Sequence, residues 1–491
     1  MVESDLLESR RKKLAALEAA GVVVFPSRFP VDGTLQQLSA AQHDRTAEEL
    51  EEAAPTVRLA GRLIALREHG KSAFADIDDG SSKLQCHLRQ KILGEDRFRA
   101  WLDLDLGDFV GVEGVMFRTR TGELTVRVDD YRLLSKALRP MPEKWHGLRD
   151  TEVRYRQRYL DLLANPDVRA VFVRRAEIIR TLRAHLDSNG FLEVETPTLQ
   201  ALYGGATAQP FETHHNTLDM DLYLRIAPEL YLKRLLVGGL QRVYDLNRNF
   251  RNEGVSRQHN PEFTMLEFYA AYWDYERMME YAEDLLCSAL GGGSEAGRIS
   301  YQGREISLQR PWKRMSMREA LLEVGGLDSE LVDDATSLSE WLRTQDVSTA
   351  GMGLGAMREA AFDKKVKPEV SSPLFVTDYP LELSPLSKAS QDDADVVERF
   401  ELFLGGMEVA NGYSELNDPR EQQRRMQEQV DGRQDDLAVP PVVDADYIVA
   451  LEHGMPPAAG IGIGVDRLVM LATDSPTIRD VILFPLLRRK D

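Results

Sequence analysis

Two glutamates in the segment RFELFLGGMEVANGYSELND (399–418) are spaced to hold a divalent cation. Gly405-Gly406 suits a two-residue hairpin turn, and pairing outward from it places Glu401 and Glu408 on one face as diagonal neighbours. Two carboxylates this close repel each other unless a cation or a proton lies between them, and hard oxygen ligands suit Mg²⁺. The alternative is a pair of solvated acids. The opposite face is apolar and consists of Leu402, Leu404, Met407 and Val409.

A second set of polar residues follows on the same strand. The pairing above sets Glu401 opposite Ala410, and strict alternation would then point the second set away from Glu408. A bulge near Gly412 is therefore expected if both sets line one cavity. The second set consists of Asn411, Tyr413 and Glu415.

Residues 243–269 predict another hairpin, with charged side chains near its tip. The strand-like stretch VYDLNRNF (243–250) is followed by the loop RNEGVSRQHNP and by a stretch that repeats at period two. Two strands joined in this way make an antiparallel hairpin with Arg251 and Glu253 on a shared face near its tip. Ordinary solvated charges on a surface hairpin are the alternative. The period-two face carries Phe263, Met265, Glu267 and Tyr269.

A strand that alternates glycine with isoleucine is predicted near the C-terminus, in GIGIGVDRLVML (460–471). Glycines at 460, 462 and 464 leave one strand face without side chains, so a flat ligand or another backbone segment can approach closely. Arg467 follows three residues after the last of these glycines. A tight packing site is the alternative for such a strand.

The segment from about 55 to 137 predicts a small β-barrel that would hold a nucleic acid. Five strand-like runs at this spacing suit a Greek-key barrel of the oligonucleotide-binding (OB) type. Such barrels bind single strands by stacking bases on aromatic side chains. Phe74 alternates with Ala73 and Ala75, so it would stack on a base, and Gln85 in the next strand would read a base edge. A place for Phe74 in the barrel core is the alternative.

The flanking segments complete the expected domain organisation. Residues 1–54 predict a helical extension, whose RRKK run (10–13) is either a solvated helix face or a contact for a nucleic-acid backbone. Residues 138–155 predict a Pro-containing linker, and the large domain would span 156–491. Within that domain, a GGGS interruption at 291–294 opens a weaker, largely helical region to about 370.

Composition and charge narrow the class of protein. The 491 residues suffice for two to four domains. Cys86 and Cys287 lie too far apart for zinc-ligand spacing, so we expect free buried thiols in a reducing compartment. A net charge of −19 argues against nonspecific nucleic-acid binding, although a basic groove on an acidic protein can still hold a specific nucleic acid. Without a signal peptide or an apolar run of transmembrane length, we expect a soluble cytoplasmic protein and no membrane partner.

These motifs resemble those of the class II lysyl-tRNA synthetases, and the resemblance runs from about residue 5 to the C-terminus. The hairpin with Arg251 is similar to motif 2 of the class II aminoacyl-tRNA synthetases, and the Gly-alternating strand with Arg467 is similar to motif 3. GFLEVETPTLQ (190–200) resembles motif 1, which builds the dimer interface in that class. The other matching stretches are KALRPMPEKWHGLRDTEVRYRQRYLDLL (136–163), ALYGGATAQPFETHHNTLDMDLYLRIAPELYLKRL (201–235), YPLELSPLSK (379–388), NGYSELND (411–418) and DSPTIRDVILFP (474–485).

The resemblance implies a site for the amino-acid end of a lysine substrate. Glu229, with the backbone at Gly205, would hold the α-ammonium. Arg251 and Asn411 would hold the carboxylate end.

The side-chain end of lysine would lie among acids and tyrosines. Tyr269 and Glu415 would meet the ε-ammonium, and Glu267 and Tyr413 would also line the pocket. A buried ammonium needs a charged, hydrogen-bonding partner, and a site built for one rejects neutral analogues strongly.

The same resemblance implies an ATP site. Arg251 would clamp the α-phosphate, Phe263 would stack on adenine and Glu253 would accept a hydrogen bond from its amino group. His259 and Arg467 would contact the β- and γ-phosphates.

The sequence departs from the common family pattern in several places. The motif 2 loop reads SRQH, where family members place a basic residue directly before the histidine. Met407, Ala410 and Tyr413 stand where arginine or lysine, glycine and phenylalanine are common. The NG-x-x-EL frame that contains Glu415 is retained.

The expected molecule is an α+β homodimeric enzyme with an antiparallel-sheet catalytic domain flanked by helices and an N-terminal OB-fold barrel for the tRNA(Lys) anticodon. The carboxylate of L-lysine would attack the α-phosphate of ATP, and the lysyl group would then pass to tRNA. Catalysis would consist of positioning and charge neutralisation by Arg251, Arg467 and Mg²⁺ on Glu401 and Glu408.

Three rival functions remain. A ligase that lysylates a protein would resemble the catalytic domain but would lack the barrel at 55–137. A nonenzymatic module that kept the fold would have lost some of the four catalytic and metal residues. An aspartate or asparagine enzyme would need a basic pocket where Glu267 and Glu415 lie.

Overall fold

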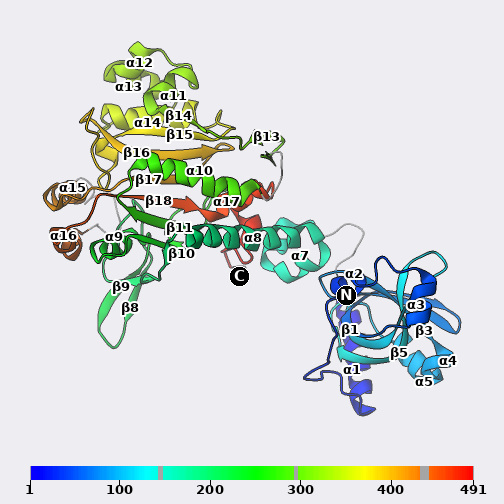
Figure 1. Ribbon diagram of the computed structural model, residues 1–491. Helices are drawn as coiled ribbons and strands as arrows, with labels where there is room; N and C mark the ends of the chain where they lie inside the picture. Colours follow the sequence, from blue (N-terminus) through cyan, green and yellow to red (C-terminus); the bar gives the residue numbers. More distant parts are fainter. Residues whose placement is uncertain (1, 142–147, 292–296, 432–441, 490–491) are drawn as a thin grey trace. The chain divides into compact units, whose positions relative to one another are not determined.

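The chain folds as two compact units, Met1–Gly147 and Leu148–Asp491 (Figure 1). The computed structural model describes residues 2–141, 148–291, 297–431 and 442–489. Most of the expected GGGS interruption and part of the expected linker therefore lie outside the described residues.

The first unit contains a closed five-stranded barrel, which confirms the predicted OB fold. Side chains alternate between its two sides, so Ala73, Ala75 and Ile77 are fully buried while Phe74 between them faces outward. Cys86 also lies in this core as a free thiol. Short helices α4 (Gln90–Leu93) and α5 (Glu95–Leu102) interrupt the strands. Around the barrel the strands run β1 (Thr56–His69), β2 (Ser72–Asp78), β3 (Lys83–Arg89), β5 (Leu124–Ser135) and β4 (Phe109–Arg118).

The predicted N-terminal extension forms three helices, α1 (Val2–Ala19), α2 (Leu35–Ala40) and α3 (Ala47–Ala53). Threonine side chains cap α2 and α3, each in a capping box. The RRKK run in α1 is only partly solvated. Arg10 is buried and donates to the Ala137 carbonyl at 3.0 Å, and Lys13 pairs with Asp105 at 2.9 Å. These two basic residues tie α1 to the barrel.

The second unit is built on an eight-stranded sheet, which is antiparallel except at its two ends. There β6 (Leu192–Glu193) pairs with β10 (Arg242–Phe250), and β14 (Lys313–Ser316) with β15 (Leu374–Pro380), in parallel. Two small sheets accompany it, β7 (Leu199–Gln200) with β9 (Met220–Leu224) and β8 (Glu212–His215), and β12 (Arg298–Tyr301) with β13 (Arg304–Ser307). The large sheet has the order β14 (Lys313–Ser316), β15 (Leu374–Pro380), β16 (Val396–Leu404), β17 (Met407–Ser414), β18 (Ala458–Gly464), β11 (Glu262–Ala271), β10 (Arg242–Phe250) and β6 (Leu192–Glu193).

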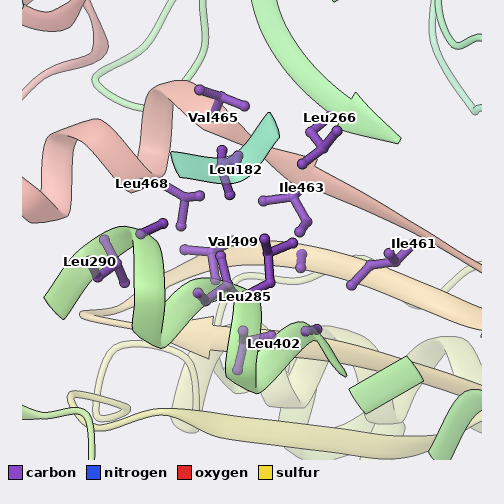
Figure 2. Packing of buried hydrophobic residues seen from close by; sticks show 14 of the residues in the cluster. Leu182, Leu266, Leu285, Leu290, Leu402, Val409, Ile461, Ile463, Val465 and Leu468 are labelled. Atoms are coloured by element: carbon purple, nitrogen blue, oxygen red, sulfur yellow. The ribbon is translucent and has the colours of Figure 1, made fainter. Parts of the chain in front are cut away.

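One face of this sheet is covered by three helices, α8 (Pro166–Ser188), α10 (Tyr275–Gly291) and α17 (Val465–Ala472) (Figure 1). Figure 2 shows strand residues such as Val409 and Ile463 packing against leucines of these helices, all of them buried. The alternation in GIGIG explains this arrangement, because its isoleucines face the helices and its glycines face the other way. The apolar face predicted around Leu402 and Met407 also lies in this core.

The other helices surround the rest of the sheet. Helices α11 (Met317–Glu323), α12 (Ser329–Asp333), α13 (Ala335–Thr344) and α14 (Leu354–Lys365) pack beyond β15 around a separate core. They lie in the region expected to be largely helical, whose first part forms the strands β12, β13 and β14. On the sheet side opposite α8 lie α9 (Glu229–Val237) and α16 (Ala445–Glu452). The remaining helices are α6 (Thr151–Arg156), α7 (Arg158–Ala164), α15 (Pro419–Asp431), α18 (Ile478–Val481) and the 3₁₀ turn η1 (Leu381–Leu383).

The predicted register of the β16–β17 hairpin is correct near the turn and wrong beyond it. Phe403 lies opposite Glu408 as expected, but a bulge follows at Val409. Glu401 consequently lies opposite Asn411 and not Ala410. The predicted bulge near Gly412 is therefore three residues nearer the turn, where the extra residue adds an apolar side chain to the core. Beyond the bulge, Glu401 and Asn411 share one face.

Within the described ranges, the structure contains no helix that is both long and apolar enough to cross a membrane.

Candidate active site

The face of the sheet opposite the helix-covered core bounds a cavity of about 330 Å³. Strand β11 contributes Met265, Glu267 and Tyr269, the period-two face predicted from the sequence. The glycines of β18 make room for these side chains. A Cβ on Gly460 would lie 2.2 Å from Tyr269 Cε1, and one on Gly462 would lie 2.6 Å from Met265 Cε. At these two positions the glycines serve close packing between strands, which was the alternative to ligand approach.

Predicted lysine-site residues from four segments line this cavity. Gly205, in a left-handed conformation with φ of +83°, lies against the Glu229 side chain. Glu415 is the exception, because it lies just behind the wall formed by Gly460 and Tyr269 and is only 1% exposed. The predicted residues that line the cavity are Gly205, Glu229, Arg251, Glu267, Tyr269, Asn411 and Tyr413.

A buried lysine holds the two acids expected to bind the ammonium groups. Lys233 comes from α9, one helical turn after Glu229, and its Nζ lies 2.6 Å from Glu229 Oε1. The same Nζ forms an ion pair with Glu415 Oε2. Tyr413 donates a hydrogen bond to Glu229 Oε1 at 2.5 Å. Burial opposes the charge of Lys233, but Glu229 and Glu415 raise its pKa well above the ordinary value.

Glu267 lies beside this group on β11. The Tyr269 hydroxyl donates to Glu267 Oε2 at 3.3 Å, so Tyr269 contacts Glu267 in this structure. Burial, reinforced by the negative charge of Glu229, raises the pKa of Glu267 to about 8, and Arg251 opposes the rise. A protonated Glu267 is therefore poised to ionise when a cation enters the cavity.

Arg251 lies at the boundary between the cavity and the predicted ATP residues. Its guanidinium lies over the Phe263 ring, with Cζ 5.2 Å from the ring centroid. Its Nε is buried and has no hydrogen-bond partner among the described residues. An unpaired buried donor is costly, so this nitrogen is available to a ligand oxygen.

The predicted metal pair lies on the same side of the sheet, and an arginine contacts each acid. Arg399 pairs with Glu401 at 2.5 Å and also donates to Asn411 Oδ1 at 3.1 Å. Arg467 lies 3.4 Å from Glu408 Oε2. Burial, together with the charge of Glu408, raises the pKa of Glu401 to about 7. The Glu408 charge therefore acts on Glu401, and the metal site on these two acids stays a prediction.

The remaining predicted ATP residues lie around the motif 2 loop. Arg467 Nη2 is 3.2 Å from His259 Nε2, and His259 Nδ1 is 2.8 Å from Ser256 Oγ. Burial, followed by the charge of Arg467, lowers the pKa of His259. A neutral imidazole that accepts from Arg467 and donates to Ser256 fits both contacts. Glu253 is exposed in the same loop.

The structure explains the three strand departures differently. Met407 and Ala410 are buried in the core between the sheet and α10, away from the cavity. Tyr413 faces the cavity, and its hydroxyl is the group that holds Glu229. Only this last departure changes the chemistry of the site.

Among the described residues, no group of three or more histidine, cysteine, aspartate or glutamate side chains is arranged to hold a metal ion. A cation on Glu401 and Glu408 would therefore take its other ligands from water or from a bound molecule.

The predicted anticodon residues lie together on the outer face of the barrel. Phe74 is absent from the barrel core and stacks on His87, with ring centroids 4.4 Å apart and planes 6° apart. Gln85 lies on the neighbouring strand and accepts a hydrogen bond from Thr125 at 3.0 Å. Phe117 is 6.1 Å from His87 on the same face. This aromatic surface could stack an unpaired base.

Sequence reasoning missed three residues that contact the predicted sites. Lys233 follows Glu229 by four residues in a helix, a spacing that places both on one side. Arg399 precedes Glu401 by two residues in a strand, which also places them on one face. His87 was hidden because only strand pairing sets it beside Phe74.

Comparisons with known proteins give matches along nearly the whole chain. Residues 150–488 match the family model of class II tRNA synthetases (D, K and N), and residues 57–134 match that of the OB-fold nucleic acid binding domain. The chain is 49% identical to the lysine–tRNA ligase of Carboxydothermus hydrogenoformans, over 99% of each chain. It is 48% identical to the lysine–tRNA ligase of Bordetella bronchiseptica, over 100% of this chain and 98% of that one.

Proposed function

The chain belongs to the class II lysine–tRNA ligases, and on that premise we propose that its acidic cavity binds L-lysine for activation by ATP and transfer to tRNA(Lys). The observation that carries this assignment is a trio of buried acids: Glu229 and Glu267 line the cavity, and Glu415 lies directly behind its wall. Acids in this number fit a ligand with two ammonium groups. They would repel the carboxylate side chain of aspartate, which rules against the aspartate rival.

The amino-acid end of lysine would lie between α9 and β17. Glu229 Oε2 lies 3.6 Å from the place of a Gly205 Cβ, so it faces the glycine backbone and would share the α-ammonium with it. The substrate carboxylate would meet the unpaired Arg251 Nε and the amide nitrogen of Asn411, whose oxygen is taken by Arg399. The ε-ammonium would extend toward Tyr269 and Glu415.

Activation would occur at Arg251, between the lysine cavity and the ATP residues. The lysine carboxylate would attack the α-phosphate, releasing pyrophosphate, and a terminal hydroxyl of tRNA would then displace AMP. No side chain needs to act as a nucleophile. Arg251 and Arg467 would neutralise phosphate charge, while Phe263 would stack on adenine, Glu253 would accept from its amino group and His259 would contact the outer phosphates.

Glu401 and Glu408 fit a Mg²⁺ ion that would accompany ATP. Burial and the charge of Glu408 raise the pKa of Glu401, and a divalent cation held by these two acids would offset the repulsion between them. Mg²⁺ usually takes only one or two carboxylates and completes its shell with phosphate oxygens and water, which agrees with the absence of a third acid among the described residues. When bound, the ion would supply charge neutralisation for the phosphates.

Further parts of the proposal concern assembly and location. Exposed apolar side chains lie on α7, α8, β6 and the C-terminal segment, as expected for a surface that a second copy covers. β6 is also a short strand at the edge of the large sheet. We infer a homodimer that works in the cytoplasm. The exposed apolar side chains on the proposed dimer surface are Tyr159, Val173, Leu192, Leu483 and Phe484, which are between 42% and 73% exposed.

Amino-acid-dependent exchange of pyrophosphate into ATP tests the assignment. We expect lysine alone among the twenty amino acids to drive exchange, and the enzyme to charge tRNA(Lys) with it. Exchange driven by aspartate or asparagine, with lysine silent, would overturn the substrate assignment. Lysylation of a protein with no charging of tRNA would favour the protein-modifying rival.

The barrel is tested separately by Phe74→Ala. Loss of stacking should cost about 1–3 kcal/mol of tRNA binding, while lysine-dependent exchange stays at the wild-type rate because the activation residues lie beyond residue 200. Both activities should be measured on one preparation, with circular dichroism to verify folding. Normal charging at limiting tRNA would show that Phe74 does not contact the anticodon.

A further inference from the structure

Lys233 is a buried cation beside the proposed lysine cavity, although no part of the reaction requires it. Its side chain is fully buried, and it contacts both acids that face the two ends of the substrate. Its ammonium also lies 5.3 Å from the Tyr413 ring centroid. A buried charge is retained only where specific partners compensate for its desolvation, so the position of Nζ is fixed by Glu229 and Glu415 together.

One carboxylate oxygen of each acid contacts Lys233 Nζ, and the other oxygen points away from it. Glu229 Oε1 takes Lys233 and the Tyr413 hydroxyl, and Glu229 Oε2 lies on the Gly205 side. Glu415 Oε2 pairs with Lys233, and Glu415 Oε1 lies 2.5 Å from the place of a Gly460 Cβ, at the cavity wall. Neither Glu415 oxygen has a well-aligned hydrogen bond within the described part of the chain. Glu415 Oε1 thus lies unpaired among the described residues directly behind the cavity wall at Gly460, and Glu229 Oε2 faces the cavity-lining backbone at Gly205.

The ion pairs of Lys233 with Glu229 and Glu415 connect the two outer carboxylate oxygens. Glu229 is held on one side of Nζ and Glu415 on the other, so the distance between their free oxygens depends on the Lys233 side chain. Without the ammonium, two buried carboxylates would repel each other and would move apart or take up a proton.

We propose that Lys233 is a positioning residue that fixes the spacing of Glu229 and Glu415, and so selects an amino acid whose two ammonium groups are separated by the chain of lysine. This inference rests on the proposed lysine site and adds the origin of its chain-length selectivity. Lys233 acts through the two acids and does not touch the reacting atoms.

An alternative is that the Lys233 ammonium occupies the place of the substrate ε-ammonium and must be displaced. Its complete burial argues against this, because a displaced ammonium would have to stay unpaired inside the protein. The two models predict opposite changes when the Lys233 charge is removed. The displacement model predicts a lower lysine KM, and the positioning model does not.

The test is the pyrophosphate-exchange kcat/KM of wild type, Lys233→Met and Lys233→Arg for three amino acids: L-lysine, L-ornithine, which is one methylene shorter, and L-homolysine, which is one methylene longer. Methionine keeps most of the volume and removes the charge. Arginine keeps the charge and lengthens the link. Lys313→Met is a matched control, because Lys313 forms only an exposed ion pair with Glu323.

For Lys233→Met we expect the preference for lysine over ornithine to fall by about tenfold or more, since one methylene is worth about 10- to 200-fold in a well-defined site. The KM for ATP should stay at the wild-type value. For Lys233→Arg the ratio of homolysine to lysine should rise. The Lys313→Met enzyme should match the wild type in every ratio.

Equal losses for all three amino acids, in both variants, would show a merely structural role and overturn the proposal. A lower lysine KM in Lys233→Met would also overturn it, since that result identifies a displaced competitor. If Lys233→Met fails to fold, unchanged ratios in Lys233→Arg suffice to reject it. Failure of the proposed function is distinguishable, because the wild-type enzyme would then show no lysine-dependent exchange.

Discussion

The candidate active site contains two pairs of glutamates, and basic side chains offset the repulsion between the acids differently in each pair. Glu401 and Glu408 lie on the β16–β17 hairpin, with side chains 13% and 33% exposed. Glu229 and Glu415 are 6% and 0% exposed. In the first pair each acid has its own arginine, and in the second a single lysine lies between the two acids.

The difference determines which ligand each pair can attract. Glu401 and Glu408 each contact their own arginine, and burial together with the charge of Glu408 raises the pKa of Glu401. On the proposed function, a divalent ion that accompanies the phosphates would relieve the repulsion between these two acids. Lys233 contacts one oxygen of each acid of the other pair, so the outer oxygens would take the two ammonium groups of the substrate. Under that proposal, the placement of the protein cation would distinguish a metal site from a diamine site.

Glu415→Gln is expected to have the largest effect, because it removes a buried partner of both the substrate and Lys233. Loss of one partner of a buried charge pair costs about 2–5 kcal/mol. The activation free energy calculated from lysine kcat/KM in the exchange assay should therefore rise by about 2–5 kcal/mol. The KM for ATP should change little, since the ATP residues lie beyond Arg251. Glu323→Gln, in an exposed ion pair, is the control. An unchanged lysine kcat/KM would remove Glu415 from the site.

Glu408→Gln should have a smaller effect and one of a different kind. It removes a metal oxygen but leaves the buried Glu401–Arg399 pair intact. The Mg²⁺ concentration for half-maximal exchange should rise by at least the roughly 10- to 100-fold that loss of a residue supporting a metal ligand costs. Saturating Mg²⁺ should recover part of the rate, which it cannot do for Glu415→Gln. If the exchange rate depends on Mg²⁺ concentration identically in Glu408→Gln and wild type, Glu401 and Glu408 do not bind the metal and are only solvated acids.

The pH dependence of lysine binding should be weaker still, and specific to the diamine site. The pKa of Glu267 is raised to about 8, so this acid is protonated in the free enzyme at neutral pH and ionises as pH rises through 8. The ionised form binds a cation better, and lysine KM should therefore fall by a few-fold between about pH 6.5 and 8. Glu267→Gln should reduce this change, and Glu415, whose pKa burial also raises to about 8, would account for what remains. A wild-type KM that rises over this interval would contradict the role of Glu267.

The sequence predicted the two folds and most of the site because the signals are local. Period-two alternation identified the cavity face of β11, and glycine alternation identified the bare face of β18. The family resemblance then supplied roles for Glu229, Asn411 and Glu415. The bulge was placed wrongly because the register depends on whether Val409 fits the helix-covered core, a property of packing across the sheet.

The cations that distinguish the two acid pairs were harder to predict. Lys233 and Arg399 have the correct spacing from their acids, but a lysine four residues after a glutamate on a helix is usually an exposed surface pair. Lys233 differs from such a surface lysine because it is buried against Glu415, which lies nearly two hundred residues away in the sequence. Such contacts follow from tertiary structure and not from spacing.

The Tyr413 hydroxyl offers the finest test of how the diamine pair is held. Phenylalanine is common at this position in the family, and here the extra hydroxyl donates to Glu229 Oε1, the oxygen that Lys233 also contacts. Tyr413→Phe removes this one hydrogen bond and leaves the ammonium in place. Because one hydrogen bond contributes about 0.5–1.5 kcal/mol net, the lysine KM should rise roughly two- to tenfold, with kcat and the Mg²⁺ dependence unchanged. Steady-state exchange at varied lysine measures it. In a Lys233→Met background the same substitution should cost more, since Glu229 would then lose its last protein partner at Oε1. Equal costs in the two backgrounds would mean that Lys233 and Tyr413 hold Glu229 independently, and that the charge of Lys233 does not organise the pair.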